Sequence, residues 1–271
     1  DANGEANITA AQIDNGSSDN CTGYTASVTP TNFDCSNLGT ETVTFTITDA
    51  SGNSSSCTAD VTVDDLLPPN VICQDITVYL DATGNVSIAP VDVDNGTSDN
   101  CGVASATVTP NSFTCAEEGA NSVTLVVTDV YGNVDSCSST VTVVDTISPS
   151  AVCQDITVQL DASGNASITA SQIDNSSSDI CGIASLSVSP STFGCADIGA
   201  NSVVLTATDV NGNSSTCNAT VTIQDTVSPT AICQDITVQL DATGNVSITA
   251  NDVDNGSNDN CGIARLDVNP S

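Results

Sequence analysis

An internal repeat of fixed length constrains this chain more than any other feature of its sequence. Cys73, Cys153 and Cys233 each open nearly the same string, CQDITVYLDATGN, CQDITVQLDASGN or CQDITVQLDATGN, at intervals of 80 residues (153 − 73 and 233 − 153). A long fixed period indicates that one structural unit recurs in tandem. The 271 residues then span about 3.4 periods (271/80) of a longer protein. The period predicts four repeats, at 1–66, 67–146, 147–226 and 227–271, the first incomplete at its N-terminus and the last at its C-terminus.

Each repeat has the pattern of short β-strands. The second repeat contains NVSIAP, ASATVTP, NSVTLVVTD and STVTVVD, which are rich in Val, Thr and Ile and partly alternate. The turn signal D-x-x-G-N occurs twice in it, at 81–85 and 129–133, and suits a four-residue hairpin. No segment carries a sustained helical stripe. Short strands with frequent turns predict an all-β fold of tandem immunoglobulin-like β-sandwiches, stapled by disulfides.

The charge of the chain excludes several functions. There are 33 acidic residues, no histidine and a single cation, Arg265, so the net charge is −32. Nucleic acids are bound through Lys and Arg, and anionic membranes repel such a chain, so we expect no nucleic-acid partner and no membrane insertion. No apolar run approaches the roughly 18 residues of a membrane helix. Only carboxylate chemistry is open, and acidic pairs recur in every repeat, which favours a scaffold over an enzyme.

Thirteen cysteines, four in each complete repeat, predict a disulfide framework and an oxidising, extracellular setting. Two pairing schemes compete: Cys137 bonds either to Cys73 in its own repeat or to Cys153 across the linker. The strand directions favour the first scheme, because a descending strand separates Cys137 from the linker by roughly 26 Å. The pairs predicted in this way are Cys21–Cys35, Cys73–Cys137, Cys101–Cys115, Cys153–Cys217 and Cys181–Cys195.

A small acidic loop precedes one cysteine of each repeat: DNGSSDNC, DNGTSDNC, DNSSSDIC and DNGSNDNC. By the strand directions, this loop, the hairpin 129–133 and the incoming linker lie at the same end of a repeat. Carboxylates and backbone or Asn carbonyls there would form a calcium site that stiffens the joint. Asx-turns alone also explain the loop, and the sequence leaves both interpretations open. The predicted ligand sets are Asp65, Asp94, Asp99 and Asp129, then Asp145, Asp174, Asp179 and Asp209, and finally Asp225, Asp254 and Asp259.

The strings CQDITV, SDNCG, TDVYGN and STVTVVDTISP resemble the hyalin-repeat family over essentially the whole chain, with Gln in place of the usual Pro after the leading cysteine. This lysine-poor, four-cysteine variant is similar to repeats of giant cell-surface adhesins of Bacteroidetes-type bacteria, which are commonly exported by the type IX system. The resemblance implies an immunoglobulin-like fold, an extracellular location at the cell surface, and an adhesive or structural role without enzyme activity. Attachment, gliding and prey capture are the roles of that group.

Two further expectations follow. Thr146 and Thr226 stand in Asp-Thr-aliphatic strings that resemble the O-glycosylation motif of Bacteroidetes, although turn and strand-end chemistry also explains them. As a whole, the chain is expected to form a stalk or fibre segment whose partners are other repeats of the same chain. A homo-oligomeric bundle and an unknown surface or glycan ligand at a distal tip are further expected partners. The alternative is a calcium-dependent carbohydrate-binding module.

Overall fold

The computed structural model describes residues 1–269. They form two compact units: the first comprises residues 1–80 and 85–144, and the second comprises 81–84 and the residues from 145 onward. The first unit thus holds the first repeat and nearly all of the second, and the other unit holds the third and fourth. The boundaries at 66, 146 and 226 stay predictions. No helix among the described residues is long and apolar enough to cross a membrane.

The first repeat consists of two small antiparallel sheets. One sheet has the strand order β2-β4-β5, and the other joins β1 to β3. A 3-10 turn at Cys35–Asn37 follows β3. The elements are β1 (Glu5–Asn7), α1 (Ala10–Ile13), β2 (Tyr24–Thr29), β3 (Asn32–Asp34), β4 (Gly39–Asp49) and β5 (Ser54–Val63).

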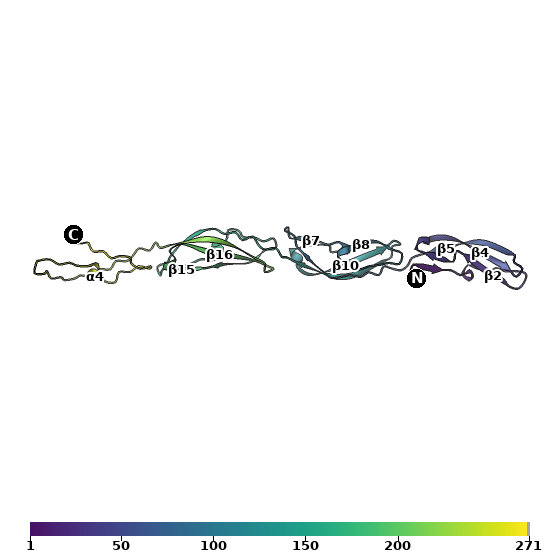
Figure 1. Cartoon of the computed structure of the whole chain (residues 1–271), viewed down its shortest axis with the longest axis horizontal. Helices are drawn as coiled ribbons and strands as arrows, with labels where there is room; N and C mark the ends of the chain where they lie inside the picture. Colours follow the sequence, from purple (N-terminus) through teal and green to yellow (C-terminus); the bar gives the residue numbers. More distant parts are fainter. Residues whose placement is uncertain (270–271) are drawn as a thin grey trace. The chain divides into compact units, whose positions relative to one another are not determined.

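The second repeat is an immunoglobulin-like sandwich of a four-stranded and a two-stranded sheet, as predicted. The larger sheet has the order β6-β11-β10-β8, in which β6 runs parallel to β11 and the other pairs are antiparallel. The smaller sheet pairs β7 with β9. Figure 1 labels β7, β8 and β10 of this repeat. The elements are β6 (Ile76–Tyr79), β7 (Asn85–Ser87), α2 (Pro90–Val93), β8 (Val103–Thr109), β9 (Ser112–Thr114), β10 (Gly119–Asp129) and β11 (Val134–Val144).

The third repeat has the same architecture. Its sheets have the orders β12-β17-β16-β14 and β13-β15. Residues of both sheets form one core, in which Leu205 and Val221 are fully buried beside Phe193. The elements are β12 (Ile156–Gln159), β13 (Asn165–Ser167), α3 (Ala170–Ile173), β14 (Ile183–Ser189), β15 (Thr192–Gly194), β16 (Gly199–Asp209) and β17 (Ser214–Gln224).

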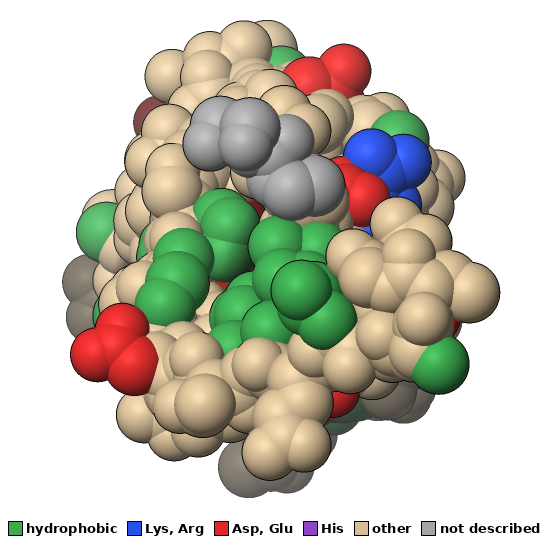
Figure 2. Space-filling view, turned by 90° about the vertical axis from the view of Figure 1, so that its left-hand side faces the viewer, with side chains coloured by type: hydrophobic (Ala, Val, Ile, Leu, Met, Phe, Trp, Pro, Cys, Tyr) green, Lys and Arg blue, Asp and Glu red, His purple; other side chains and the backbone are tan. Residues whose placement is uncertain are grey.

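The described part of the fourth repeat contains α4 (Ala250–Val253) and two isolated bridges, Thr230–Asn258 and Cys233–Asp254. Figure 2 shows apolar side chains gathered on this end. Leu240 is 66% exposed here, whereas its counterpart Leu160 is 4% exposed because β16 and β17 cover it. The exposed apolar side chains of this end therefore include a position that belongs to the core in the third repeat.

Two local features differ from the expectation. The turn at 129–133 closes the hairpin β10–β11, but the same signal at 81–85 joins β6 to β7, which belong to different sheets. Each repeat also holds a one-turn helix. In α3 the Gln172 side chain accepts from the backbone N–H of Thr169 at 2.8 Å, and in α2 Asp92 accepts from Ala89 at 2.7 Å. Gln and Asp both cap the helix, which explains why this position varies between repeats.

The disulfides combine two kinds of connection. Cys73–Cys137 and Cys153–Cys217 lie within their repeats, as the strand directions favour. In contrast, Cys35–Cys101 and Cys195–Cys261 join consecutive repeats. The predicted pairs Cys21–Cys35, Cys101–Cys115 and Cys181–Cys195 are therefore wrong. Cys115 and Cys181 are disulfide-bonded, and Cys21, Cys57 and Cys233 are free and exposed.

The physical reason for this error lies in the course of the chain after Cys101. β8 and β6 both run antiparallel to β10. After β6 the chain turns back, so β7 runs in the direction of β10, and β9, which is antiparallel to β7, runs in the direction of β8. The seven residues of β8 alone extend over about 23 Å. Cys101 and Cys115 therefore lie at opposite ends of one repeat, and Cys101 instead meets the cysteine at the near end of the preceding repeat.

Candidate metal centre

The inward face of a long strand in the second repeat ends in a carboxylate. The buried side chains Val123, Leu125 and Val127 of β10 alternate with more exposed ones, and Asp129 continues the alternation. The period of two residues in a strand therefore places Asp129 on the core side, where it is 2% exposed. Strand geometry alone thus buries a group that strongly prefers water.

Three acidic residues of the first unit meet where the first repeat joins the second. Asp65 lies two residues beyond Val63, the end of β5, and is buried; Asp99 lies in the loop before β8. One carboxylate oxygen from each of Asp65, Asp99 and Asp129 lies within 4.8 Å of the others.

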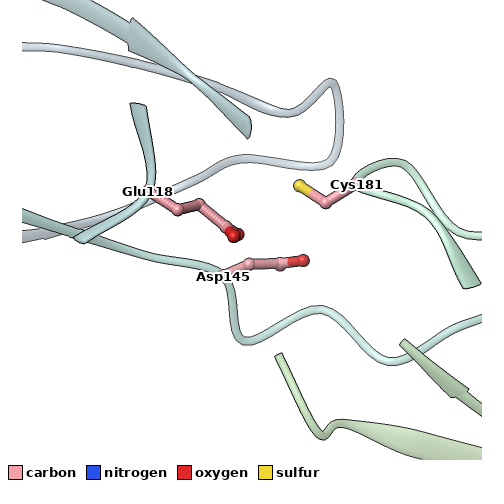
Figure 3. A group of neighbouring side chains, drawn as sticks. All are labelled: Glu118, Asp145 and Cys181. Carbon is pink, nitrogen blue, oxygen red and sulfur yellow. The ribbon is translucent and has the colours of Figure 1, made fainter. Parts of the chain in front are cut away.

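The second unit holds an equivalent group. Asp145, Asp179 and Asp209 lie equally close to one another, and Asp145 and Asp209 are 3% and 1% exposed. In Figure 3 the carboxylate of Asp145 points toward the loop that carries Cys181. The two triads are related by the 80-residue period, so the same fold produces the same cluster twice.

Both triads contain carboxylate oxygens that are buried and have no hydrogen-bond partner. Oδ1 of Asp99 accepts from the backbone N–H groups of Cys101 and Gly102, each at 2.8 Å, but its Oδ2 has no donor. Oδ2 of Asp65 and Oδ2 of Asp145 are unpartnered in the same way. An unpaired buried charge is costly, and three carboxylates so close together repel one another. These oxygens therefore fit a bound cation.

An asparagine that the sequence analysis did not assign orders each triad. Nδ2 of Asn133 donates to Oδ2 of Asp129 at 2.7 Å and to the backbone oxygen of Asp65 at 3.0 Å. Asn213 makes the same two contacts in the second unit, with Oδ2 of Asp209 at 2.9 Å and the backbone oxygen of Asp145 at 3.2 Å. The signal was present in the sequence, because this Asn is the last residue of the D-x-x-G-N turn.

A second amide distinguishes the two triads. Nδ2 of Asn100 donates to Oδ1 of Asp65 at 3.3 Å, so the first triad has an amide beside its carboxylates. The counterpart of Asn100 in the third repeat is Ile180, which is apolar and half-exposed. The second triad therefore lacks this amide.

Asp129 is held in its charged form. Burial, the largest effect, raises the pKa of Asp129, but the donors around it together lower that pKa below its ordinary value of 3.8. These donors are the side chain of Asn133 and the backbone N–H groups of Tyr131, Gly132 and Asn133. The carboxylate is thus ready to bind a cation at neutral pH.

The donor chemistry of the triads fits calcium. All available donors are hard oxygens, and the nearby Cys101 and Cys181 are disulfide-bonded, so no thiolate is present for a softer metal. The single basic side chain of the sequence, Arg265, pairs on the surface with Asp267 and with neither triad.

Asp94 and Asp174 do not belong to these groups, so their assignment as ligands is corrected, whereas the assignment of Asp254 stays a prediction because the described residues of its joint form no triad. Each carboxylate instead closes its own loop by accepting from the backbone N–H three residues later, at 3.1, 3.0 and 3.0 Å. The side-chain hydrogen bond from Thr97, Ser177 or Ser257 is the main cause that lowers the pKa of each one. The Asx-turn interpretation therefore accounts for Oδ1 of the first acid of the loop, which accepts from the backbone of its own loop.

The remaining predicted residues form a partial group. Oδ1 of Asp225 accepts from Nδ2 of Asn260 at 3.1 Å, and Oδ1 of Asp259 and Oδ1 of Asn260 are buried without a partner. The position equivalent to Asp129 and Asp209 would be residue 289, beyond Ser271. Thr146 and Thr226, the expected glycosylation positions, are both exposed.

Comparison with known proteins gives one relative. No protein-family model matches the chain. Hyalin of Strongylocentrotus purpuratus is 34% identical over an alignment of 214 residues, and the match covers 72% of this chain and 17% of hyalin. The chain therefore spans about a sixth of the length of that relative. This match supports hyalin-like repeats with an immunoglobulin-like fold.

Solved structures with some similarity are multidomain β-proteins. A protocadherin gammaB7 EC3-6 cis-dimer is 16% identical, with a TM-score of 0.33, over 78% of this chain and 64% of that chain. A three-immunoglobulin-domain segment of titin is 12% identical, with a TM-score of 0.35, over 81% of this chain and 87% of that chain. Likeness at this level adds nothing to the fold that the strand order already defines.

Proposed function

We propose that this chain is a structural stalk or fibre segment of a long extracellular surface adhesin, stiffened at its joints by disulfides and calcium. The observation that carries the proposal is the construction of the joint. Within the first unit, Cys35–Cys101 bonds two consecutive repeats, and Asp65 of one repeat meets Asp99 and Asp129 of the next. A protein that only needed folded repeats would not require both connections at the same place.

Calcium would stiffen the joint, because without a cation the three carboxylates repel one another. The free oxygens of Asp65 and Asp99, with the carboxylate of Asp129, would provide three of its ligands. A divalent cation would replace mutual repulsion by attraction to a common centre, and Asp65 would be held to the following repeat. Asp145, Asp179 and Asp209 would act in the same way. Asp225 and Asp259 are the corresponding acids of the last joint, where a third acid would complete the ligand set.

The finer assignments follow the sequence resemblance. Display at the cell surface of a Bacteroidetes-type bacterium, type IX export and a role in attachment, gliding or prey capture belong to this proposal, as do lateral bundling and glycosylation at Thr146 and Thr226. Other repeats of the same chain are the primary partners, and a surface or glycan ligand would bind at a distal tip. A calcium-dependent carbohydrate module is less favoured, because the exposed Tyr24, Tyr79 and Tyr131 occupy three different repeat positions.

The decisive experiment measures calcium binding and its effect on stability in the full chain. The variant Asp129→Asn with Asp209→Asn removes one ligand from each triad, and Asp135→Asn, an exposed acid, is the control for a change in charge. We expect calcium to raise the melting temperature of the wild type and of the control, and to have little effect on the double variant. A melting temperature that is the same in calcium and in chelator for the wild type would contradict the calcium site.

A further inference from the structure

The disulfides of each unit cross one another along the chain. In the first unit two of the disulfides are 35–101 and 73–137, and their cysteines follow in the order 35, 73, 101 and 137. In the second unit two of the disulfides are 153–217 and 195–261, and their cysteines follow in the order 153, 195, 217 and 261. In both units one bond begins inside the loop that the other bond closes. Crossed bonds close two overlapping loops, whereas bonds in series would close separate loops with uncovered backbone between them.

The joint is built around the bond between repeats. A Cβ added to Gly4 would lie 2.6 Å from Sγ of Cys35 and 3.1 Å from the backbone oxygen of Asn100. Gly4 also has a φ of +74°, which disfavours other residues. On the other side, the backbone N–H of Cys101 is held by Asp99 at 2.8 Å. The disulfide therefore requires a glycine beside Cys35, and a hydrogen bond from the backbone of Cys101 to Asp99 fixes the other cysteine.

Because the two bonds cross, every residue between Cys35 and Cys137 lies inside at least one disulfide loop. Residues 36–100 lie inside the loop closed by Cys35–Cys101, and residues 74–136 lie inside the loop closed by Cys73–Cys137. The same holds from Cys153 to Cys261 in the second unit. We propose that this covalent ladder keeps the chain in one piece after a single backbone cut anywhere within either stretch. The proposal depends on the disulfides alone and is independent of calcium and of adhesion.

Single cuts in the full chain test the ladder. One protease recognition sequence is inserted in the exposed hairpin 50–53 or in the exposed turn 110–111. The control insertion is at 16–18, a surface segment outside both disulfide-closed loops. The free thiols of Cys21, Cys57 and Cys233 are alkylated first so that no exchange occurs. After cleavage, the products are separated on denaturing gels with and without reductant, and their masses are measured.

Without reductant, cuts at 50–53 and 110–111 are expected to release no fragment, whereas the cut at 16–18 releases the N-terminal piece. With reductant, all three cuts release fragments. A fragment released without reductant by a cut at 50–53 or 110–111 would overturn the proposal.

Removing one bond at a time assigns each cut to its bond. In Cys35→Ser with Cys101→Ser, the cut at 50–53 should release a fragment and the cut at 110–111 should not. In Cys73→Ser with Cys137→Ser, the two results should be reversed. A fourth insertion at 95–96 lies inside both disulfide loops and should release a fragment only when both bonds are removed. The same behaviour in both variants would contradict the pairing on which the ladder rests.

Discussion

At the scale of single residues, close contact and charge decide which side chains the joints allow. Gly164 of the second unit occupies the same place as Gly4: an added Cβ would lie 2.7 Å from Sγ of Cys195 and 2.8 Å from the backbone oxygen of Asn260. The glycine of this turn is therefore required twice, once by its positive φ and once by the disulfide that joins two repeats.

The variant Gly164→Ala should weaken that joint. A positive φ costs a non-glycine residue about 1–2 kcal/mol, and the collision with Cys195 adds to this cost. Gly244→Ala is a matched control, because it lies in the same turn with a φ of +80° and no atom within 4 Å of the added Cβ. We expect Gly164→Ala to lower the melting temperature more and to slow formation of Cys195–Cys261, measured by thiol alkylation during oxidative refolding. Equal effects of the two variants would show that only the φ matters.

Asp129 gives a prediction about pH. Its pKa lies below the ordinary value because of the donors around it, chiefly Asn133, so this part of the stability is present above about pH 4 and is lost as the pH falls through the lowered pKa. The variant Asn133→Ala should therefore melt below the wild type at pH 6, and the difference should shrink toward pH 3. Melting curves in chelator measure it. A difference that does not change with pH would mean that Asn133 acts only through its contact with the backbone of Asp65.

At the scale of elements, the alternation of side chains in the long strands carries both the core and the site. In β16 the fully buried Val203, Leu205 and Ala207 lead to Asp209 on the same face. A shift of register by one residue would expose the core and withdraw the carboxylate together, so the packing that stabilises the sandwich also positions the triad.

The core of the third repeat can be tested with Leu205→Ala. Leu205 is 0% exposed, and the loss of such a side chain leaves a cavity that costs about 2–5 kcal/mol. Val210→Ala, at a position 56% exposed beyond the end of the same strand, is the control and should change stability little. Thermal unfolding of the full chain should show a lower transition for Leu205→Ala alone. Similar melting of both variants would contradict the assignment of β16 to the core.

The sequence predicted those parts of the fold that depend on local pattern. The strands, the hairpin at 129–133 and the approach of Asp65 to Asp99 and Asp129 follow from alternation, turn residues and strand direction. The one-turn helices were not predicted, because four residues are too few for a helical stripe. The turn at 81–85 leads from one sheet to the other because the partners of β6 and β7 are distant in sequence, and no local signal specifies those partners.

Three of the five predicted disulfides are wrong and Asp94 lies outside the acidic triad, for related reasons. The sequence pattern pairs Cys101 with Cys115 of its own repeat, whereas its partner, Cys35, belongs to the preceding repeat. Asp94 was counted as a ligand because of its place in the loop, but its carboxylate already accepts from the backbone N–H of Thr97. Both errors arise because proximity along the chain was taken for proximity in space.

At the scale of each whole unit, the crossed disulfides also limit how far the chain can lengthen when it unfolds. From Cys35 to Cys137 the backbone has 102 residues (137 − 35), which would extend to about 350 Å. The shortest covalent path crosses Cys35–Cys101, returns over 28 residues (101 − 73) and crosses Cys73–Cys137, which is about 95 Å. A chain built in this way would keep its length under tension even when its sandwiches unfold.

Removing the bonds should lengthen the unfolded chain in a non-additive way. Without Cys73–Cys137 the path runs over 36 residues (137 − 101), and without Cys35–Cys101 it runs over 38 (73 − 35), so either loss adds only about 30 Å. Loss of both bonds restores the full backbone and adds about 250 Å. Force spectroscopy of the full chain, with attachment points just outside the pair at positions 34 and 138, measures these lengths. If one pair of Cys→Ser changes alone released most of the length, the bonds would act in series, and the ladder would not limit extension.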